Sequence, residues 1–131
     1  MEDTQATVRF EMGGMLFEYD SEKNRKNIEK HGISFKSAAR IFFDYDRIEL
    51  YDAVHSGDED RYNTIGDISA GISVAIGNLR KNVYKMSDIL FVVYTERNII
   101  DDNGVFREVT RLISARLATN FERGVYYGKY H

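Results

Sequence analysis

The sequence of 131 residues has no cysteine, no proline and no tryptophan, and it has only three histidines. Without cysteine, disulfides, thiolate catalysis and cysteine-ligated zinc or iron–sulfur sites are excluded. The histidines stand far apart, at His31, His55 and His131, which argues against a multi-histidine metal centre. We therefore expect neither a metal ion nor another cofactor.

Long apolar runs are missing as well. No run approaches the ~20 residues that a membrane-spanning helix needs, and no signal-peptide pattern begins the sequence. The expectation is a cytoplasmic protein without membrane contact. The length and the content of 43% hydrophobic and 30% charged residues are typical of one globular domain. We expect a single domain over residues 1–131 that begins with a flexible arm at 1–14.

Charge is unevenly distributed along the chain. The net charge of −3 argues weakly against a nucleic-acid partner. Residues 21–43, however, carry a net +4 and residues 111–131 a net +3, whereas residues 44–60 carry −6. Such segregation can present a basic face to a polyanion despite the net sign. The alternative is that these charges belong to ordinary solvated helix faces.

Apolar periodicity and capping signals predict an α+β fold in the first third of the chain. A strand is expected at 15–20, after which Asp20 or Ser21 caps a polar helix. Gly32 stands where a left-handed residue ends a helix at least cost. Ser34 caps a second helix, whose apolar residues fall at i, i+3, i+4 and i+7. This stripe consists of Phe35, Ala38, Ala39 and Phe42.

The rest of the chain is dominated by strand signals. Runs rich in β-branched and aromatic residues predict strands at 47–53, 61–67, 71–76, 89–95 and 105–113. The run at 89–95 is continuously apolar, so it belongs at the centre of a mainly antiparallel sheet with the helices on one side. Thr119 and Glu122 form a capping-box signal for a last helix. Its inner face is expected to carry Ala118, Phe121 and Val125.

Short motifs follow one another in a fixed order over about Phe17–Tyr127. They are FEYD at 17–20, Lys23, Asn27, KHGISF at 30–35, Asp52, His55-Ser56, Asp58-Glu59, Arg61, Gly66, VVYTER at 92–97, RLISAR at 111–116, Ala118, Glu122-Arg123 and Tyr126. This ordered set resembles the BrnT family of toxins. The resemblance implies a RelE-like fold, with an antiparallel sheet of four to six strands and two N-terminal helices and one C-terminal helix packed on it.

The same resemblance implies a function and partners. It implies toxin activity on RNA and inhibition by a cognate antitoxin of the BrnA type, and it leaves open a homodimer within the toxin–antitoxin complex. The chain departs from the family where residues 69–87 look inserted in place of a short turn, and in its acidic net charge. The insertion can add a lid, extend the sheet or interfere with a partner surface.

A ribonuclease that works without metal needs a base for the 2′-hydroxyl, an acid for the 5′-oxygen and cations for the phosphate. Arginine suits the last role because its planar guanidinium binds phosphate oxygens in pairs and stays charged. In the family-like motifs the candidate catalytic arginines are Arg97, Arg116 and Arg123. Candidate RNA or phosphate ligands are Arg61, Lys30 and Arg111, although Lys30 also fits a solvated helix charge and Arg116 a salt bridge to Glu122 or Asp67.

Two residues compete for the proton-transfer role. Glu96 is a candidate base, but it also fits an ion pair at a strand end, and alternation in a continuing strand would turn it away from Arg97. His31 is the alternative acid or base, but a histidine at the end of a helix often only complements the helix dipole. His55, in an acidic loop, fits a mobile surface residue. The choice between Glu96 and His31 stays open.

The leading hypothesis is a ribonuclease toxin that cleaves RNA by 2′-hydroxyl attack and is silenced by an antitoxin. The alternative is a non-catalytic BrnT-like module that binds an antitoxin-like partner or a second copy of itself. The segment at 69–87 and the acidic charge motivate that alternative.

Overall fold

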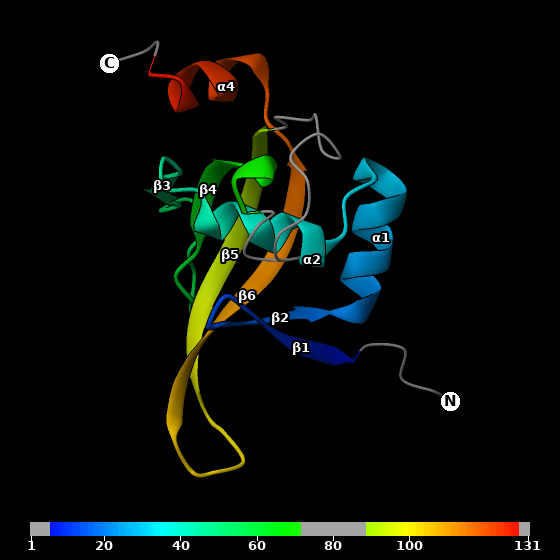
Figure 1. Cartoon of the computed structure of the whole chain (residues 1–131), viewed down its shortest axis with the longest axis vertical. Coiled ribbons are helices and arrows are strands. Elements are labelled where there is room, and N and C mark those ends of the chain that lie inside the picture. The colour runs from blue at the N-terminus through cyan, green and yellow to red at the C-terminus, as the bar shows by residue number, and fades with distance from the viewer. Residues whose placement is uncertain (1–5, 72–88, 129–131) are drawn as a thin grey trace.

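The computed structural model describes residues 6–71 and 89–128, which form an α+β fold around one six-stranded sheet (Figure 1). The strand order is β1-β2-β6-β5-β4-β3. The strands are β1 (Thr7–Met12), β2 (Met15–Asp20), β3 (Ile48–Tyr51), β4 (Tyr62–Asp67), β5 (Ile89–Ile100) and β6 (Phe106–Leu117). Neighbouring strands are antiparallel except for β2 and β6, which run parallel.

The sheet is therefore mainly antiparallel, as the residues predicted, but its one parallel pair makes it mixed and corrects the antiparallel sheet that the family resemblance implied. A parallel pair needs a long connection, and here the first two helices and three further strands of the described residues lie between β2 and β6 in the chain. Alternation within a strand shows which residues share a face, but it carries no information on the direction of the neighbouring strand.

Three helices and two 3-10 turns complete the described residues. They are α1 (Ser21–His31), α2 (Phe35–Ala38), η1 (Ala39–Phe43), η2 (Ile68–Gly71) and α4 (Asn120–Tyr126). The Asp20 side chain accepts hydrogen bonds at the start of α1, and Gly32 ends it with φ 72°. The capping box of Thr119 and Glu122 begins α4. These predicted caps are confirmed.

The second predicted helix is only partly α-helical, because the chain tightens into η1 at Ala39. Its apolar stripe is nevertheless confirmed, since all four residues of the stripe are buried. The expected inner face of α4 is wrong at Phe121, which is 64% exposed, whereas Gly124 is buried. The buried residue of this short helix is therefore a glycine. A pattern of apolar side chains cannot reveal such a residue, because glycine has no side chain.

The expected flexible arm at 1–14 contains β1. Gly13 and Gly14 both have positive φ, as a two-residue hairpin turn requires, and they connect β1 to β2. Phe10 of β1 then stacks on Phe17 of β2 with ring centroids 5.3 Å apart. The Gly-Gly pair is the sequence signal for this hairpin.

The expected strands at 89–95 and 105–113 are both longer in the structure. β5 and β6 each span twelve residues and form a hairpin that extends beyond the rest of the sheet (Figure 1). The turn at its tip includes Gly104 with φ 76°. The expected strand at 71–76 and most of the segment 69–87 lie outside the described residues.

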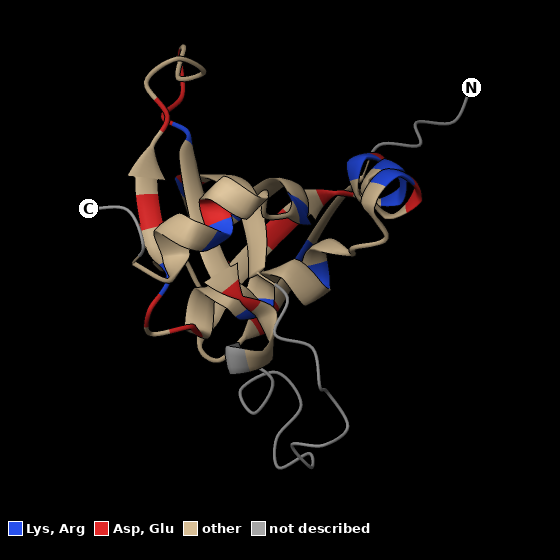
Figure 2. Cartoon of the chain, turned by 90° about the horizontal axis from the view of Figure 1, so that it is seen from above, with Lys and Arg blue, Asp and Glu red and all other residues tan. Residues whose placement is uncertain are grey.

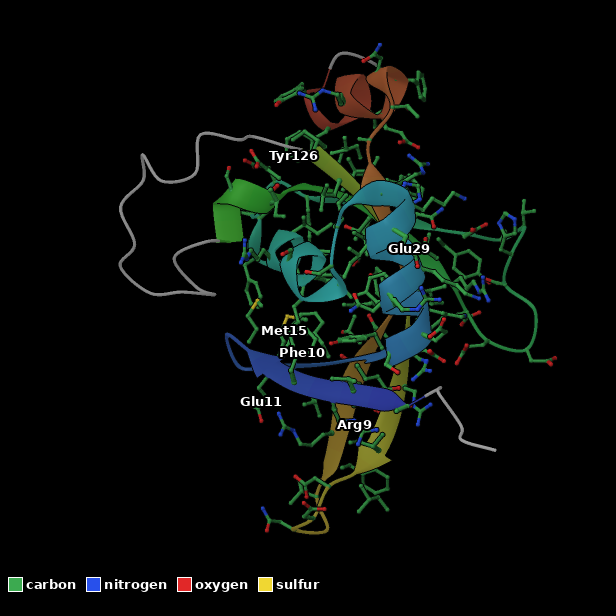
Figure 3. The ribbon with its side chains drawn as sticks, turned by 90° about the vertical axis from the view of Figure 1, so that its right-hand side faces the viewer. Arg9, Phe10, Glu11, Met15, Glu29 and Tyr126 are labelled. Carbon is green, nitrogen blue, oxygen red and sulfur yellow. The ribbon has the colours of Figure 1, made fainter. Side chains whose placement is uncertain are left out.

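The core lies between one face of the sheet and α2 with η1; this face is called the helix-covered face below. Phe17, Phe35, Phe42 and Tyr94 are buried there and meet mostly edge to face, as at the 5.0 Å contact of Phe42 with Tyr94. Figure 3 shows the alternation in the first hairpin: Phe10 and Met15 point toward the helices, whereas Arg9 and Glu11 point away. Charged residues of the same strands are thereby placed on the second face.

The close approach of η1 to the sheet explains a glycine in β4. A Cβ at Gly66 would lie 2.9 Å from Cβ of Ile41 and 3.3 Å from its carbonyl oxygen. Only a residue without a side chain therefore fits at this position of the strand.

Asn27 of α1 binds the open edge of β6. Pairing of β2 with β6 covers Val109–Leu112, and no strand among residues 6–71 and 89–128 pairs with the edge that follows. The Asn27 amide donates to the Ala115 carbonyl oxygen at 2.8 Å and accepts from the Ala115 N–H at 3.2 Å, as a strand would. It also donates to the Ile33 carbonyl oxygen, and the adjacent Asn24 accepts from the Phe35 N–H. The two asparagines thus fix the corner between α1 and α2 against the sheet.

Among the described residues, no helix has the length and apolar character needed to cross a membrane.

The substitution Asn27→Ala should lower the free energy of unfolding by about 2–4 kcal/mol, because it leaves both backbone groups of Ala115 without their partner. Urea unfolding measures this loss. Lys26→Ala, an exposed change on the same helix, should stay within about 0.5 kcal/mol of the unsubstituted chain. Equal midpoints for the two variants would contradict the role of Asn27.

Candidate functional site

Glu18 of β2 is fully buried on the face opposite to the helices. Its neighbours Phe17 and Tyr19 belong to the core, so alternation turns Glu18 to the second face. There its carboxylate binds Arg9 Nη2 at 2.7 Å and Arg111 Nη1 at 2.8 Å, and Arg97 Nε lies 3.3 Å away. The three arginines come from β1, β6 and β5; together they are called the arginine cluster.

The arginine cluster has a positive surplus. Burial raises the pKa of Glu18, but the hydrogen bonds from Arg9 and Arg111 and the charge of Arg97 outweigh this effect and hold the pKa below its ordinary value of 4.5. Glu18 is therefore ionised at neutral pH and neutralises one of three guanidinium groups. All three arginine side chains are partly exposed, so the remaining charge is accessible to an anion.

A pocket of about 360 Å³ lies further along the same face. Residues of the loop 52–61, β4, β5 and β6 line it: Asp52, His55, Arg61, Asn63, Phe91, Val93, Ile113, Ser114 and Arg116. It is called the His55 pocket below. Two guanidinium groups and an imidazole thus share one recess.

The loop that carries His55 is closed by its own hydrogen bonds. The Asp52 N–H donates to the Arg61 carbonyl oxygen at 2.9 Å, and the Ser56 hydroxyl donates to the Asp52 carbonyl oxygen at 2.6 Å. His55 is bound to Asp52 twice, through its backbone N–H at 3.1 Å and through Nδ1 at 2.9 Å. His55 is exposed, as expected, but the Asp52 carboxylate orients its ring.

Asp52 is held as an anion by these contacts. Partial burial raises the pKa of its carboxyl, but the hydrogen bonds from His55 and from the Asn63 side chain outweigh it, so the pKa lies below the ordinary value. Because the carboxylate is bound to Nδ1, the other ring nitrogen of His55, Nε2, is the one left to contact a ligand.

Arg116 is fixed at the edge of the His55 pocket. Its guanidinium binds both carboxylate oxygens of Glu122, at 2.8 and 3.0 Å, and lies 4.2 Å from the ring centroid of Phe91. Of the two salt bridges weighed for Arg116, the structure contains the one to Glu122. The hydrogen bond with Glu122 also raises the pKa of Arg116.

Glu96 and Arg97 lie on opposite faces of β5, as alternation in a continuing strand predicts. Glu96 faces Glu108 and Glu49 on the helix-covered side; burial and the charge of Glu108 raise its pKa. The pocket beside it, of about 420 Å³, is lined mainly by acidic residues, namely Asp58, Glu59, Asp60, Glu96 and Glu108, with Tyr62, Arg97 and Asn98. Arg97 lines this pocket as well, but its Nε lies 3.3 Å from the Glu18 carboxylate, so its ion pair is with Glu18 and not with Glu96.

The other predicted site residues are dispersed. Lys30 and His31 lie in the last turn of α1, a helix whose ribbon has several blue segments for Lys and Arg in Figure 2, and neither residue lines the His55 pocket. Arg123 lies in the last turn of α4. Arg61 lines the His55 pocket, and Arg111 belongs to the arginine cluster.

Two functional residues escaped the sequence reasoning. Glu18 had a signal, since a carboxylate between two core aromatics in the motif FEYD indicates a buried charge that needs a partner. The pairing of Asp52 with His55 has a weaker sequence signal. The two residues are three positions apart, a spacing at which an aspartate in a turn can bind a later residue.

No group of three or more His, Asp or Glu side chains within residues 6–71 and 89–128 is arranged to hold a metal ion.

Replacing Glu18 with Gln should destabilise the protein at pH 7 by about 2 kcal/mol, because three guanidinium groups lose their anion. The estimate is below the 3–5 kcal/mol typical of a broken buried pair because the arginines are partly exposed. Glu11→Gln is the matched control, since Glu11 forms an exposed pair with Arg107, and it should cost less than about 1 kcal/mol.

The pH dependence provides a second measurement on the same variants. A lowered folded-state pKa means that the contribution of Glu18 is complete above its ordinary value of 4.5 and is lost as pH falls through the folded value. Urea unfolding between pH 5 and pH 3 should therefore show a steeper acid loss for the unsubstituted chain than for Glu18→Gln. Parallel curves would contradict a depressed Glu18 pKa.

The comparisons with known proteins agree with the sequence motifs. A family model described as "Ribonuclease toxin, BrnT, of type II toxin-antitoxin system" matches residues 19–87, from the end of β2 past β4. No curated protein matches the chain. The family model covers more than half of the sequence, and the chain therefore belongs to the BrnT family of ribonuclease toxins from type II toxin–antitoxin systems.

Proposed function

We propose that this protein cleaves RNA without a metal ion, by attack of a 2′-hydroxyl on the adjacent phosphate, and that a cognate antitoxin of the BrnA type inhibits it. The observation that carries the proposal is the positive surplus of the arginine cluster on one face of a chain whose family consists of ribonuclease toxins. The products of this reaction are a 2′,3′-cyclic phosphate and a 5′-hydroxyl.

The open face suits a phosphate backbone. Arg107 and Arg111 alternate to this side of β6, and Arg97 joins them from β5. Arg116 reaches the same side because the register between β5 and β6 shifts by one residue at Val93 and Tyr94. A guanidinium that a carboxylate already orients loses little side-chain freedom when it binds phosphate. Such preorganised cations stabilise the charge that develops on a five-coordinate phosphorus.

The net charge of −3 is compatible with this partner because carboxylates gather elsewhere. The pocket beside Glu96 contains five acidic residues, and Glu96 itself lies on the helix-covered side of β5. RNA would be repelled there and attracted to the face of the arginine cluster. Charge is thus segregated in space, although Arg9 and Arg97 of the cluster come from outside the two basic segments of the sequence.

This geometry favours some of the predicted site residues over others. Arg97 and Arg111 fit phosphate ligands in the arginine cluster, and Arg61 and Arg116 fit them in the His55 pocket. The surroundings of Glu96 support no proton transfer at a phosphate on the second face. Nothing in the geometry of His31, Lys30 or Arg123 supports a direct role.

The finer assignments of fold and assembly rest on the family. We infer that the sheet and helices represent a RelE-like fold, that the protein acts in the cytoplasm, and that the antitoxin complex is where two copies would meet if the toxin dimerises. The α+β architecture supports the first of these inferences.

One observation favours the alternative of a non-catalytic binding module. Glu18 and Glu122 already occupy Arg97, Arg111 and Arg116, so phosphate must compete with internal carboxylates. In this alternative the arginines would bind acidic side chains of a partner protein, and expression of the chain would leave growth unchanged.

Purified protein, freed of antitoxin and supplied with EDTA, should cleave RNA and leave 2′,3′-cyclic phosphate ends. Arg97→Ala and Arg116→Ala should each lower the cleavage rate by about 10²–10³-fold, as loss of a preorganised charge-stabilising group does. Arg25→Ala is the control, since Arg25 is exposed on α1 and its ion pairs within the described part of the chain are with Glu22 and Glu29 of its own helix.

Growth after induced expression provides the cellular measurement. The unsubstituted chain should stop growth, Arg97→Ala and Arg116→Ala should relieve the arrest, and coexpressed antitoxin should relieve it too. If all variants are equally harmless and no preparation degrades RNA, the ribonuclease proposal fails and the binding module stands.

A further inference from the structure

We propose that His55 is the general base of the RNA cleavage reaction and that Asp52 is its positioning residue. The inference rests on the proposed ribonuclease function and assigns its proton transfer to a site that sequence reasoning passed over. It depends on three features: the contact of His55 with Asp52, the two arginines of the same pocket, and the closed loop that carries the imidazole.

The contact with Asp52 selects the reactive nitrogen of His55. Asp52 Oδ2 lies 2.9 Å from Nδ1, and Asp52 Oδ1 accepts from the His55 backbone N–H at 3.1 Å. An anionic partner on Nδ1 places the proton there and leaves the lone pair on Nε2. It also stabilises the imidazolium that forms when Nε2 accepts a proton.

The neighbours of His55 supply the cations that a phosphate needs. Arg61 and Arg116 line the same pocket of about 360 Å³, and Ser114 contributes a hydroxyl. A phosphate held by these guanidinium groups would bring a ribose hydroxyl within the reach of an imidazole in the same recess. Neither His31 nor Glu96 combines a titratable group with two arginines in this way.

Hydrogen bonds within the loop 52–61 fix the positions of His55 and Arg61. Ser56 Oγ accepts from the Arg61 N–H at 2.9 Å and donates to the Asp52 carbonyl oxygen, so it joins both ends of the loop. Asn63 of β4 hydrogen-bonds the Asp52 carboxylate as well. His55 and Arg61 are therefore held in a fixed relation to the sheet, although both belong to a surface loop.

The reaction step balances without a co-reactant other than water. His55 Nε2 takes the proton of the 2′-hydroxyl as O2′ bonds to phosphorus. The bond between phosphorus and O5′ breaks, and the departing oxygen takes a proton from water. The imidazolium then returns its proton to solvent, and the 2′,3′-cyclic phosphate leaves.

The test compares His55→Asn with the unsubstituted protein in single-turnover cleavage of a 5′-labelled RNA of mixed sequence. Asparagine can still donate to Asp52 from the position of Nδ1, but it has no basic nitrogen. We expect the cleavage rate to fall by about 10²–10³-fold, within the range for a general base. Binding of the same RNA with 2′-O-methyl groups, which cannot react, should change by less than about threefold.

Asp52→Asn tests the positioning role through the pH profile. The charged groups around His55 are Asp52, Arg61 and Arg116, and only Asp52 is removed. Loss of its anion destabilises the imidazolium, so the acid limb of the pH–rate profile should move to lower pH, whereas a merely structural change would lower the rate at every pH. In His55→Asn this limb should disappear.

His31→Asn is the matched control, since it changes the same residue type on α1 and should leave the rate unaltered. Thermal unfolding verifies that each variant is folded. If the unsubstituted protein cleaves RNA and His55→Asn cleaves it equally fast, the assignment of His55 is overturned while the ribonuclease proposal stands. If the unsubstituted protein forms no cyclic phosphate from any RNA, both are overturned.

Discussion

The buried carboxylate of Glu18 is the constraint on which this structure depends. It joins β2 to arginines of β1, β5 and β6, and so connects the first hairpin of the chain to the long hairpin near its end. A buried carboxylate is stable only where several donors offset its lost hydration, and here three guanidinium groups do so. The register of the parallel strands β2 and β6 places Glu18 opposite Arg111, which allows the two side chains to pair.

The same interaction divides the molecule into two chemical environments. On one face of the sheet, aromatic side chains pack against α2 and η1. On the other, arginines surround Glu18 and continue toward the His55 pocket, where Arg116 is held by Glu122. Carboxylates orient the arginines of this face in both places. An acidic protein can thereby present preorganised cations to a polyanion, because its own anions are arranged to position them.

Local signals in the sequence predicted the elements well. Caps such as Asp20 and Gly32, and the capping box at Thr119, act within a few residues, so a single chain segment contains the whole interaction. The polar segment before residue 15 was misjudged, because β1 gains its stability from Phe17 of the next strand. The local signal for β1 is the Gly-Gly pair of the hairpin turn, but the polar composition of this segment favours an unstructured arm.

The candidate site was harder to predict, since its residues meet only across the sheet. The alternation of β5 correctly separated Glu96 from Arg97, but it could not show that Arg97 points toward Glu18, 79 positions earlier in the numbering. Nor could it show that His55 shares a pocket with Arg116. The approach of Arg97 to Glu18 depends on the parallel pairing of β2 with β6, whereas the His55 pocket depends on the antiparallel pairing of β4 with β5 and of β5 with β6.

The sequence by itself determined the family, the caps and the alternation of apolar and charged side chains, because each of these is written in neighbouring residues. Only the tertiary structure decided which charges of distant segments meet. Ion pairs between distant strands, the asparagine that binds the edge of β6 and the pocket around His55 all arise from packing. Their partners are far apart along the chain, and no local interaction specifies them.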